Sequence, residues 1–367
     1  MYKGFATKEG TEGFFRKNGS VSPKSVKECD YFLLSSLGIG TYKPEAYKEE
    51  NYTFSYKDAV KKAVSMGCNH IDTAANYRYA KSESEIGEAL SELFESGYNR
   101  DELVIATKGG FFPFSYPFPQ NPYHWINDEI VKSGLAKESD IVTDEHCLTP
   151  EYIEWSLEES LKRLNVECVD IFYIHNPEFE LGIVSNEDLL LKFKKLSKML
   201  EGKIKDGKIK HYGIASWNGF LYEEGELEYL SMADFVAASR EYGDGLRFVQ
   251  LPYNLAKPHP YIYANQKIED KYYTAMSAAI KLGLNVITSS SLLQMNLFKR
   301  AFSPAFRDVC GLSLASDLQR ALQFARSNPS VLSSLVGASM AEHVEHDFAI
   351  LGEPIVDSKN YENFFRL

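Results

Sequence analysis

Short apolar runs alternate with amphipathic helical segments along almost the whole chain. Eight of these runs are rich in β-branched or aliphatic residues and have the length of strands. Strands separated by helices pair in parallel, so the repeat predicts a parallel sheet covered by helices. Eight such units are the number that closes into a (β/α)8 TIM barrel, an α/β fold that forms a single domain. The predicted strands cover residues 33–41, 68–74, 102–108, 168–175, 208–216, 247–253, 285–290 and 331–339.

The segments between these runs carry helix start signals. A serine followed three residues later by an acidic residue has the spacing of a capping box, and a threonine followed by proline is typical of an N-cap and a first turn. These signals support a helix after each predicted strand. They are Ser55 with Asp58, Ser82 with Glu85, Ser339 with Glu342, and Thr149 with Pro150.

Two parts of the chain do not fit the repeat. Residues 1–30 precede the first strand and are expected to form an N-terminal extension to a barrel of residues 31–367. Residues 109–148 form an inserted loop after the third strand that is too long for an ordinary βα connection. Its many aromatic residues suggest a lid over a substrate, and packing on the barrel rim is the alternative. In either case it lies at the catalytic face.

Charge and composition narrow the class of partner. The chain has 51 acidic and 40 basic residues, a formal charge of -11, which argues against nucleic acid or an anionic membrane surface. We therefore expect a small-molecule substrate. The chain has no run of 18 apolar residues, its start lacks the apolar core of a signal peptide, and its five cysteines form no Cys-x-x-Cys pair. A cytoplasmic protein with reduced cysteines is expected, and the oligomeric state is not predicted.

Reactive side chains fall at the ends of three consecutive predicted strands. Asp72 ends the second strand, Lys108 the third and His175 the fourth, while Tyr77 follows the second. The carboxyl ends of parallel strands meet at one face of a barrel, and neighbouring strands lie about 4.8 Å apart, so these side chains can touch. Each alone has an ordinary structural explanation. Together they predict a site, because a partly buried Asp72–Lys108 pair is costly to keep.

This set of side chains suits the delivery of a proton to a carbonyl oxygen. A tyrosine titrates near 10 in water, and a neighbouring ammonium is expected to lower the pKa of Tyr77. Asp72 would hold Lys108 in place, and His175 could hydrogen-bond the carbonyl oxygen. Reduction also needs a hydride, which no side chain supplies. A nicotinamide cofactor is therefore implied.

Six stretches resemble the aldo-keto reductase family of NADPH-dependent (β/α)8 barrels. They are "GCNHIDTAANY", "LVIATKGG", "DIFYIHNPE", "HYGIASWN", "VQLPYN" and "VGASMAEHVEHDF", in a similarity that runs from about residue 33 to about residue 351. The resemblance implies an oxidoreductase that reduces an aldehyde or ketone to an alcohol, or catalyses the reverse. It places the family's catalytic aspartate, tyrosine, lysine and histidine on Asp72, Tyr77, Lys108 and His175.

The resemblance also implies where the cofactor and substrate bind. Ser289 stands where the family usually has a ring stacked on the nicotinamide, and Ser339 where an arginine commonly grips the 2′-phosphate. NADPH is expected, with NADH as the alternative, and Lys299 or Arg300 is the alternative holder of that phosphate. The implied cofactor contacts are Gly40, Thr41, Ser216, Asn218, Gln250, Ser289, Ser290, Gly337, Ser339 and Asp347, with Trp217 interrupting the Ser216–Asn218 pair. The expected substrate contacts are Tyr42, Phe111 and Trp125.

Other functions remain open at this point. A dinucleotide-binding Rossmann domain would need Gly-x-Gly-x-x-Gly, which the sequence lacks. A metal-dependent hydrolase would have His343, His346 and His70 as its best ligands, a weak set, and we expect no metal. The alternative from another class is a non-catalytic barrel that binds NADP(H) as a sensor or regulatory subunit. The missing stacking ring favours it, whereas the complete set of four reactive side chains favours an enzyme.

Overall fold

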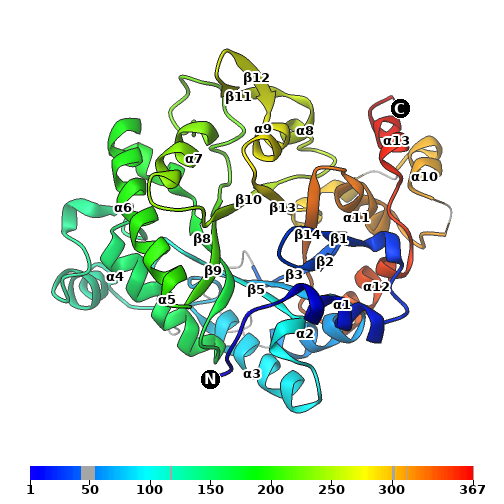
Figure 1. Ribbon diagram of the computed structural model, residues 1–367, viewed down its shortest axis with the longest axis horizontal. Coiled ribbons are helices and arrows are strands. Elements are labelled where there is room, and N and C mark those ends of the chain that lie inside the picture. The colour runs from blue at the N-terminus through cyan, green and yellow to red at the C-terminus, as the bar shows by residue number, and fades with distance from the viewer. Residues whose placement is uncertain (43–53, 116–117, 300–301, 312, 367) are drawn as a thin grey trace.

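The computed structural model describes residues 1–42, 54–115, 118–299, 302–311 and 313–366. Within these ranges eight parallel strands form a closed barrel (Figure 1). Each lies inside one of the predicted runs, give or take a residue, so the predicted fold class is confirmed. In order around the barrel the strands are β3 (Leu37–Gly40), β4 (His70–Asp72), β5 (Val104–Gly109), β8 (Val169–His175), β9 (Ile209–Ala215), β10 (Leu246–Pro252), β13 (Asn285–Ser289) and β14 (Val331–Gly337), which pairs with β3.

A helix follows each barrel strand and packs on the outside of the barrel (Figure 1). Most residues on the inward and outward faces of the strands are buried, which explains why the strand runs are largely apolar. The covering helices are α2 (Tyr56–Ser65), α3 (Lys81–Glu95), α5 (Pro150–Leu164), α6 (Asn186–Lys205), α7 (Met232–Arg240), α9 (Ala275–Lys281), α11 (Asp317–Ser327) and α12 (Ala341–Phe348).

A helix begins within two residues of each of the four predicted start signals, but only two of the four predicted capping residues are the N-caps. Ser55 and Thr149 are the N-caps of α2 and α5, and each side chain accepts a backbone N–H of the first turn. Ser82 lies inside α3 and donates to the carbonyl of Thr41 instead, 3.2 Å away. Ser339 precedes the N-cap of α12 by one residue. The N-cap of α3 is Ala80, which provides no side-chain cap, and the buried hydroxyl of Ser82 is satisfied by a tertiary acceptor instead.

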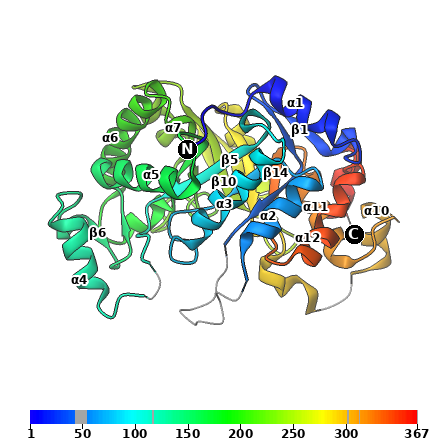
Figure 2. The same cartoon turned by 90° about the horizontal axis from the view of Figure 1, so that it is seen from below.

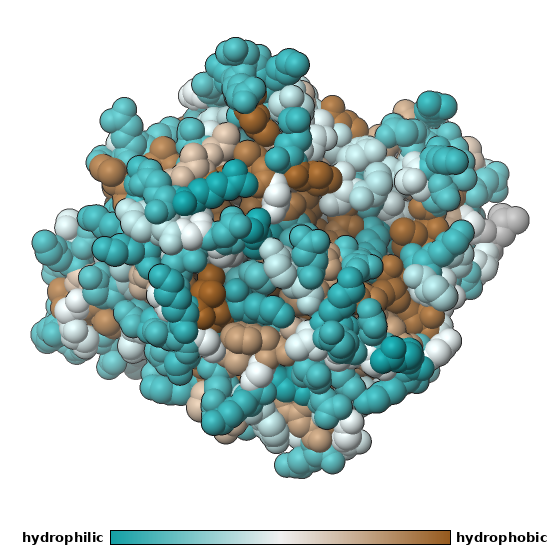
Figure 3. Space-filling view, in the orientation of Figure 1, coloured by the Kyte–Doolittle hydropathy of each residue, from teal (hydrophilic) through white to brown (hydrophobic). Residues whose placement is uncertain are grey.

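The N-terminal segment closes one end of the barrel. Helix α1 (Lys8–Lys17) is followed by a hairpin of β1 (Val26–Glu28) and β2 (Leu33–Ser35). Phe32 is buried and stacks on Phe248 of β10 at 6.1 Å between ring centroids. In Figure 2 α1 and β1 lie along the upper edge of the molecule. Figure 3 shows that hydrophilic residues predominate on the face seen in Figure 1, with hydrophobic residues among them.

The described part of the 109–148 insert packs on the rim of the barrel at the opposite edge (Figure 2). Its aromatic side chains pack on one another and on α5: Phe112 contacts Trp125 and Tyr152, with ring centroids 6.1 and 5.2 Å apart. The threonine that caps α5 also donates to the carbonyl of Leu135 at 2.6 Å. The insert contains α4 (Pro122–Ile126), a π-helical turn (Asn127–Val131), a 3₁₀ turn (Glu138–Asp140), β6 (Ile141–Val142) and β7 (His146–Cys147).

No helix within the described ranges is both long and apolar enough to cross a bilayer. The remaining connections contain shorter helices, strands and turns. The shorter elements are α8 (His259–Ile262), the hairpin of β11 (Ala264–Ile268) and β12 (Lys271–Thr274), α10 (Pro304–Cys310), α13 (Ser358–Tyr361), and 3₁₀ turns at Pro23–Ser25, Arg100–Glu102, Pro177–Gly182, Leu293–Lys299, Ala349–Gly352 and Glu362–Phe365.

Candidate active site

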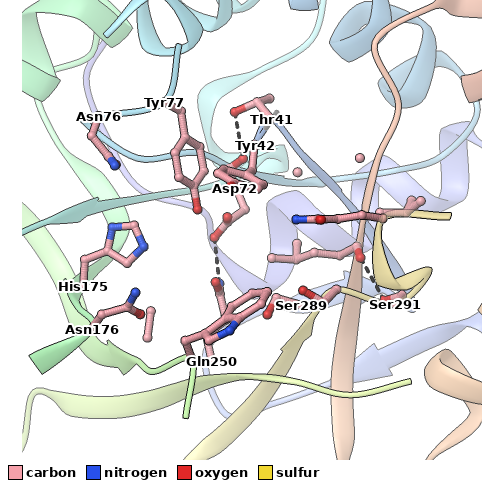
Figure 4. Close-up of a pocket in the computed structure, with 18 of the residues that line it drawn as sticks. Thr41, Tyr42, Asp72, Asn76, Tyr77, His175, Asn176, Gln250, Ser289 and Ser291 are labelled. Atoms are coloured by element: carbon pink, nitrogen blue, oxygen red, sulfur yellow. Dashed lines mark hydrogen bonds between the residues drawn. The ribbon is translucent and has the colours of Figure 1, made fainter. Parts of the chain in front are cut away.

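A cavity of about 630 Å³ opens at the carboxyl ends of the barrel strands. This volume suits a small-molecule ligand. Side chains from the ends of six barrel strands and from the loops that follow them contribute to its wall, some of which Figure 4 shows. The cavity therefore lies at the face where a TIM barrel carries its chemistry.

Asp72 is hydrogen-bonded through both carboxylate oxygens. Lys108 donates to Oδ1, and also to the carbonyl of Thr73 at 2.8 Å. Gln250, from the far side of the barrel, donates to Oδ2 at 2.8 Å (Figure 4). The ion pair is buried, with Asp72 2% and Lys108 1% exposed. Burial lowers the pKa of Lys108, although the Asp72 charge opposes this. The predicted Asp72–Lys108 contact is thus present.

A strained loop presents Tyr77 to the cavity. The three residues after it, Arg78, Tyr79 and Ala80, all have left-handed backbone angles, with φ of 49°, 58° and 63°. Such angles cost non-glycine residues about 1–2 kcal/mol each. An ion pair of 2.6 Å between buried Arg78 and Glu85 of α3 ties the loop to the barrel. Tertiary contacts therefore compensate the strain and set the position of Tyr77.

The predicted lowering of the pKa of Tyr77 by Lys108 is wrong. Burial, and then the charge of Asp72, raises the pKa of Tyr77 well above 10. The ammonium of Lys108 is bound to Asp72 and lies 5.2 Å from the centre of the tyrosine ring. The phenol consequently keeps its proton at neutral pH and is ready to act as an acid.

His175 is the last residue of β8 and faces the same space as Tyr77, with ring centroids 5.9 Å apart. Figure 4 shows both side chains and that of Asn76 directed toward this space. Burial, followed by the charges of Lys108 and His146, lowers the pKa of His175 well below 6.5. A neutral ring has one N–H donor, which it can offer to a carbonyl oxygen.

Most of the expected cofactor contacts line the cavity, and two do not. The side chain of Asn218 donates to Glu228 at 3.4 Å, and that of Asp347 is buried against His346. Ser216 borders the cavity, but its hydroxyl donates to Glu178 at 3.0 Å. Arg300 and the side chain of Lys299 lie outside the described residues. The expected cofactor residues in the lining are Gly40, Thr41, Ser216, Gln250, Ser289, Ser290, Gly337 and Ser339.

Of the three expected substrate contacts, two line the cavity and one does not. Tyr42 and Phe111 line the cavity, and Phe111 lies 5.0 Å from the ring of His175. Trp125 packs inside the insert against Phe114, 4.8 Å between centroids, and is not part of the lining formed by the described residues. The structure thus brings the start of the insert to the cavity but not its aromatic centre.

Several lining residues were not expected from the sequence. Two of them are Asn76 and Asn176, which adjoin Tyr77 and His175 in the chain. Their position next to two predicted catalytic residues could have indicated that they line the site. Asn176 has a left-handed backbone with φ of 47°, which asparagine tolerates. Trp217 is 38% exposed, and Lys257 lies 5.3 Å from its ring centre. It therefore offers an aromatic surface in a cavity that has a serine at the end of β13.

Two paired glycines form the part of the wall that best fits a flat or extended cofactor. Gly40 and Gly337 are register partners in β3 and β14, and both line the cavity. A Cβ added to either would meet no protein atom closer than 3.7 Å, so protein packing does not require glycine there. Gly213, by contrast, has no room, with Tyr173 at 2.6 Å. Because both glycines line the cavity, their lack of a side chain lets a ligand backbone or phosphate approach the strand backbone closely.

The start of α12 adds donors for an anion at this end of the cavity. Its N-cap, Met340, provides no side-chain cap, which leaves first-turn N–H groups without that acceptor. The N-terminus of a helix favours a phosphate, and Ser339 of the adjoining loop lines the cavity. The residues present therefore fit a dinucleotide cofactor.

The histidines considered as metal ligands lie apart. His70 is buried in β4 with Nδ1 3.1 Å from the hydroxyl of Ser333, whereas His343 is exposed on α12. Within the described ranges, no three His, Cys, Asp or Glu side chains are grouped as a metal site requires.

The carboxyl end of this TIM barrel thus brings together a buried Asp–Lys pair, a protonated tyrosine and a neutral histidine. The chain belongs to the aldo/keto reductase family, whose model matches residues 36–362.

The relatives that match in sequence do so over part of their length. The putative voltage-gated potassium channel subunit beta of Schizosaccharomyces pombe is 30% identical over 52% of this chain and 44% of its own. The L-glyceraldehyde 3-phosphate reductase of Escherichia coli K12 is 26% identical over 50% and 42%. The chain thus spans less than half the length of these curated relatives.

Solved structures share the fold over nearly the whole chain. An aldo-keto reductase of Bacillus halodurans in its holo form has a TM-score of 0.61 and 16% identity, covering 93% of this chain and 94% of its own. An aldo/keto reductase of Klebsiella pneumoniae in complex with NADP and acetate has a TM-score of 0.58 and 18% identity, covering 94% and 95%. At these identities the likeness concerns the fold.

Proposed function

We propose that the protein is an NADPH-dependent oxidoreductase that reduces an aldehyde or ketone to an alcohol, or catalyses the reverse. The observation that carries the proposal is the convergence of Asp72, Tyr77 and His175 on one cavity, with Lys108 paired to Asp72. Gly40 and Gly337 line the same cavity. The names of relatives agree with it: one is an aldo-keto reductase of Schizosaccharomyces pombe marked NADP(+), and another is the L-glyceraldehyde 3-phosphate reductase above.

Each of the four side chains has a distinct role in this proposal. The nicotinamide cofactor supplies the hydride. Neutral His175 donates to the carbonyl oxygen and orients the substrate. Tyr77 gives its proton to that oxygen as it gains negative charge, because an alkoxide is a stronger base than even a phenolate of raised pKa. Lys108, held by Asp72, lies 5.2 Å from the centre of the tyrosine ring, and this buried ion pair helps to fix the position of the phenol.

The finer assignments are also proposals. Gly40, Thr41, Gln250, Ser289, Ser290, Gly337 and Ser339 hold the cofactor, and Tyr42 and Phe111 contact the substrate. Residues 31–367 are the catalytic barrel, residues 1–30 an extension that closes its far end, and residues 109–148 an insert that shapes the substrate side. A cytoplasmic location is supported by five buried free cysteines, since free thiols are typical of reducing compartments.

Replacement of Tyr77 by Phe tests the proposal. The change removes one oxygen and keeps the ring packing, so NADPH affinity and folding should hardly change. Carbonyl reduction, followed by NADPH oxidation at 340 nm against a panel of aldehydes and ketones, should fall by about 10² to 10⁴-fold. Tyr31→Phe, the same change at the closed end of the barrel, is the control and should keep full activity. A fully active Tyr77→Phe enzyme would rule out the proposed mechanism.

A further inference from the structure

We infer that His146, a residue of the insert, is a positioning residue that holds the backbone of His175 through a hydrogen bond from a doubly protonated ring. This inference rests on the proposed function. It gives the insert a role that does not depend on covering the substrate. His146 carries none of the roles assigned above, yet it lies directly behind the histidine to which the mechanism assigns substrate orientation.

His146 makes two buried polar contacts, one with each ring nitrogen. Its side chain is 0% exposed. Nε2 lies 2.8 Å from the carbonyl oxygen of His175, and Nδ1 lies 3.3 Å from Oε1 of Glu180, which is also 0% exposed. The other carboxylate oxygen of Glu180 accepts from Lys192 of α6 at 2.5 Å. A continuous chain of polar contacts thus runs from α6 to the backbone of His175.

The partners of the ring define its protonation. A carbonyl oxygen can only accept, so Nε2 of His146 must carry a proton to make the contact with His175. Burial raises the pKa of Glu180, but its hydrogen bonds outweigh burial and lower it; because the ammonium of Lys192 donates to Oε2, the carboxylate is ionised. An ionised carboxylate also only accepts, so Nδ1 must carry a proton as well. His146 is therefore an imidazolium paired with Glu180.

The backbone around this contact is closely packed. β7 returns the insert to the barrel, where His146 forms a bridge with Phe111. Gly110 lies between the two histidines, with a positive φ of 151°. A Cβ at this position would lie 2.8 Å from both Nε2 of His146 and the carbonyl oxygen of His175. Only glycine lets the insert approach His175 this closely.

The charge of His146 also acts on the ring of His175. It contributes, after burial and Lys108, to the low pKa that keeps His175 neutral. Around His146 the charged or titratable groups are Glu180 from the turn after β8, Lys192 from α6 acting through Glu180, His175 from β8, and the chain neighbours Glu145 and Cys147. Around His175 they are Lys108, Tyr77 and His146.

Two matched substitutions separate the hydrogen bond from packing. In His146→Gln the side-chain amide can take the place of Nε2 and still donate to the carbonyl of His175. In His146→Asn the shorter amide takes the place of Nδ1, so the contact with Glu180 survives and that with His175 is lost. We expect kcat/KM for carbonyl reduction to fall by about 10 to 10²-fold in His146→Asn, the scale of a misplaced catalytic group. His146→Gln should stay within about threefold of wild type, because it keeps the positioning bond.

The affinity for NADPH and the thermal unfolding of both variants are measured alongside. His211→Gln, which removes a histidine near the closed end of the barrel, controls for the loss of a partly buried ring. Equal kcat/KM in the Gln and Asn variants, whether both fall or both stay at the wild-type value, would overturn the inference and leave His146 with a role in stability alone.

The protonation is tested without turnover. In protein labelled with ¹⁵N at histidine, the signals that disappear in His146→Gln should be those of two protonated ring nitrogens at pH 7. A single protonated nitrogen would contradict the imidazolium. Because this spectrum does not depend on catalysis, a failure of the proposed function, seen as an inactive wild-type protein, is distinguishable from a failure of the inference.

Discussion

Gln250 donates to the carboxylate of Asp72 from the opposite side of the barrel, at 2.8 Å, while Lys108 donates to the other oxygen of the same carboxylate. β4, β5 and β10 are thereby joined at one buried point beneath the cavity. The aspartate cannot rotate without breaking one of these bonds. Gln250, expected only as a cofactor contact, therefore also fixes the ion pair.

Asp72→Asn should lower both stability and activity. The change leaves the ammonium of Lys108 buried without a counter-charge, at a cost of about 3–5 kcal/mol in the free energy of unfolding. The double variant Asp72→Asn/Lys108→Met removes the unpaired charge, so urea unfolding should show much of the stability restored while reduction stays impaired. Full activity in the double variant would show that the pair serves only the fold.

Gly40→Ala and Gly337→Ala should weaken the binding of the cofactor without lowering the stability of the fold. Each new methyl group would meet protein atoms only at ordinary contact distances of 3.7 Å or more, and both glycines line the cavity. Thermal unfolding should be unchanged or slightly raised, whereas the NADPH dissociation constant, measured by fluorescence, should rise about tenfold or more, equal to 1.4 kcal/mol or more. Gly213→Ala is the contrasting variant: its methyl group would meet Phe248 O at 2.7 Å, so it should destabilise the barrel.

Wild-type protein should prefer NADPH to NADH by less than a hundredfold, equivalent to about 2.7 kcal/mol. The reason is that Ser339 and the uncapped start of α12 offer neutral donors to a phosphate. Ser339→Arg should increase the preference for NADPH, because a guanidinium group can form two charge-assisted hydrogen bonds with a phosphate. Fluorescence titration of both cofactors measures it. An unchanged ratio in the variant would place the 2′-phosphate elsewhere.

Phe111 and Trp125 should behave differently when each is replaced by Leu. Phe111 lines the cavity and contacts the ring of His175, so Phe111→Leu should raise KM for good carbonyl substrates. Trp125 packs within the insert, and Trp125→Leu should mainly lower thermal stability. Steady-state kinetics and thermal unfolding of both variants test this. A large rise in KM for Trp125→Leu alone would favour a lid that closes over the substrate.

Stability should fall as the pH drops from 7 to 5, in part because of His70. The ring is fully buried, and burial lowers its pKa to about 4. The unfolded chain takes up a proton below pH 6.5 while folded His70 stays neutral, so stability is lost as pH falls toward 4. At pH 5 this amounts to about 2 kcal/mol from this group. Urea unfolding of wild type and His70→Gln at both pH values should show a shallower dependence in the variant.

Much of the fold and of the catalytic set follows from patterns along the chain. The periodicity of a strand or a helix can be recognised from neighbouring residues alone. Eight strands, each followed by a helix, then predict a closed parallel barrel. Because parallel strands end at one face, Asp72, Lys108 and His175 had to meet there once the strand ends were known. The order of apolar runs thus determined the barrel, the face that carries the site and the identity of its reactive residues.

Contacts between distant segments decided the rest. Whether Asn218 or Trp125 faces the cavity depends on partners that no local pattern specifies, Glu228 and Phe114 respectively. The pKa of Tyr77 rises because packing removes water from the phenol, a quantity that the spacing of charges does not reveal. The hydrogen bond from His146 to His175 joins residues 29 positions apart and exists only because the insert folds back onto the rim. Side-chain direction and desolvation are properties of packing, and only the tertiary structure sets them.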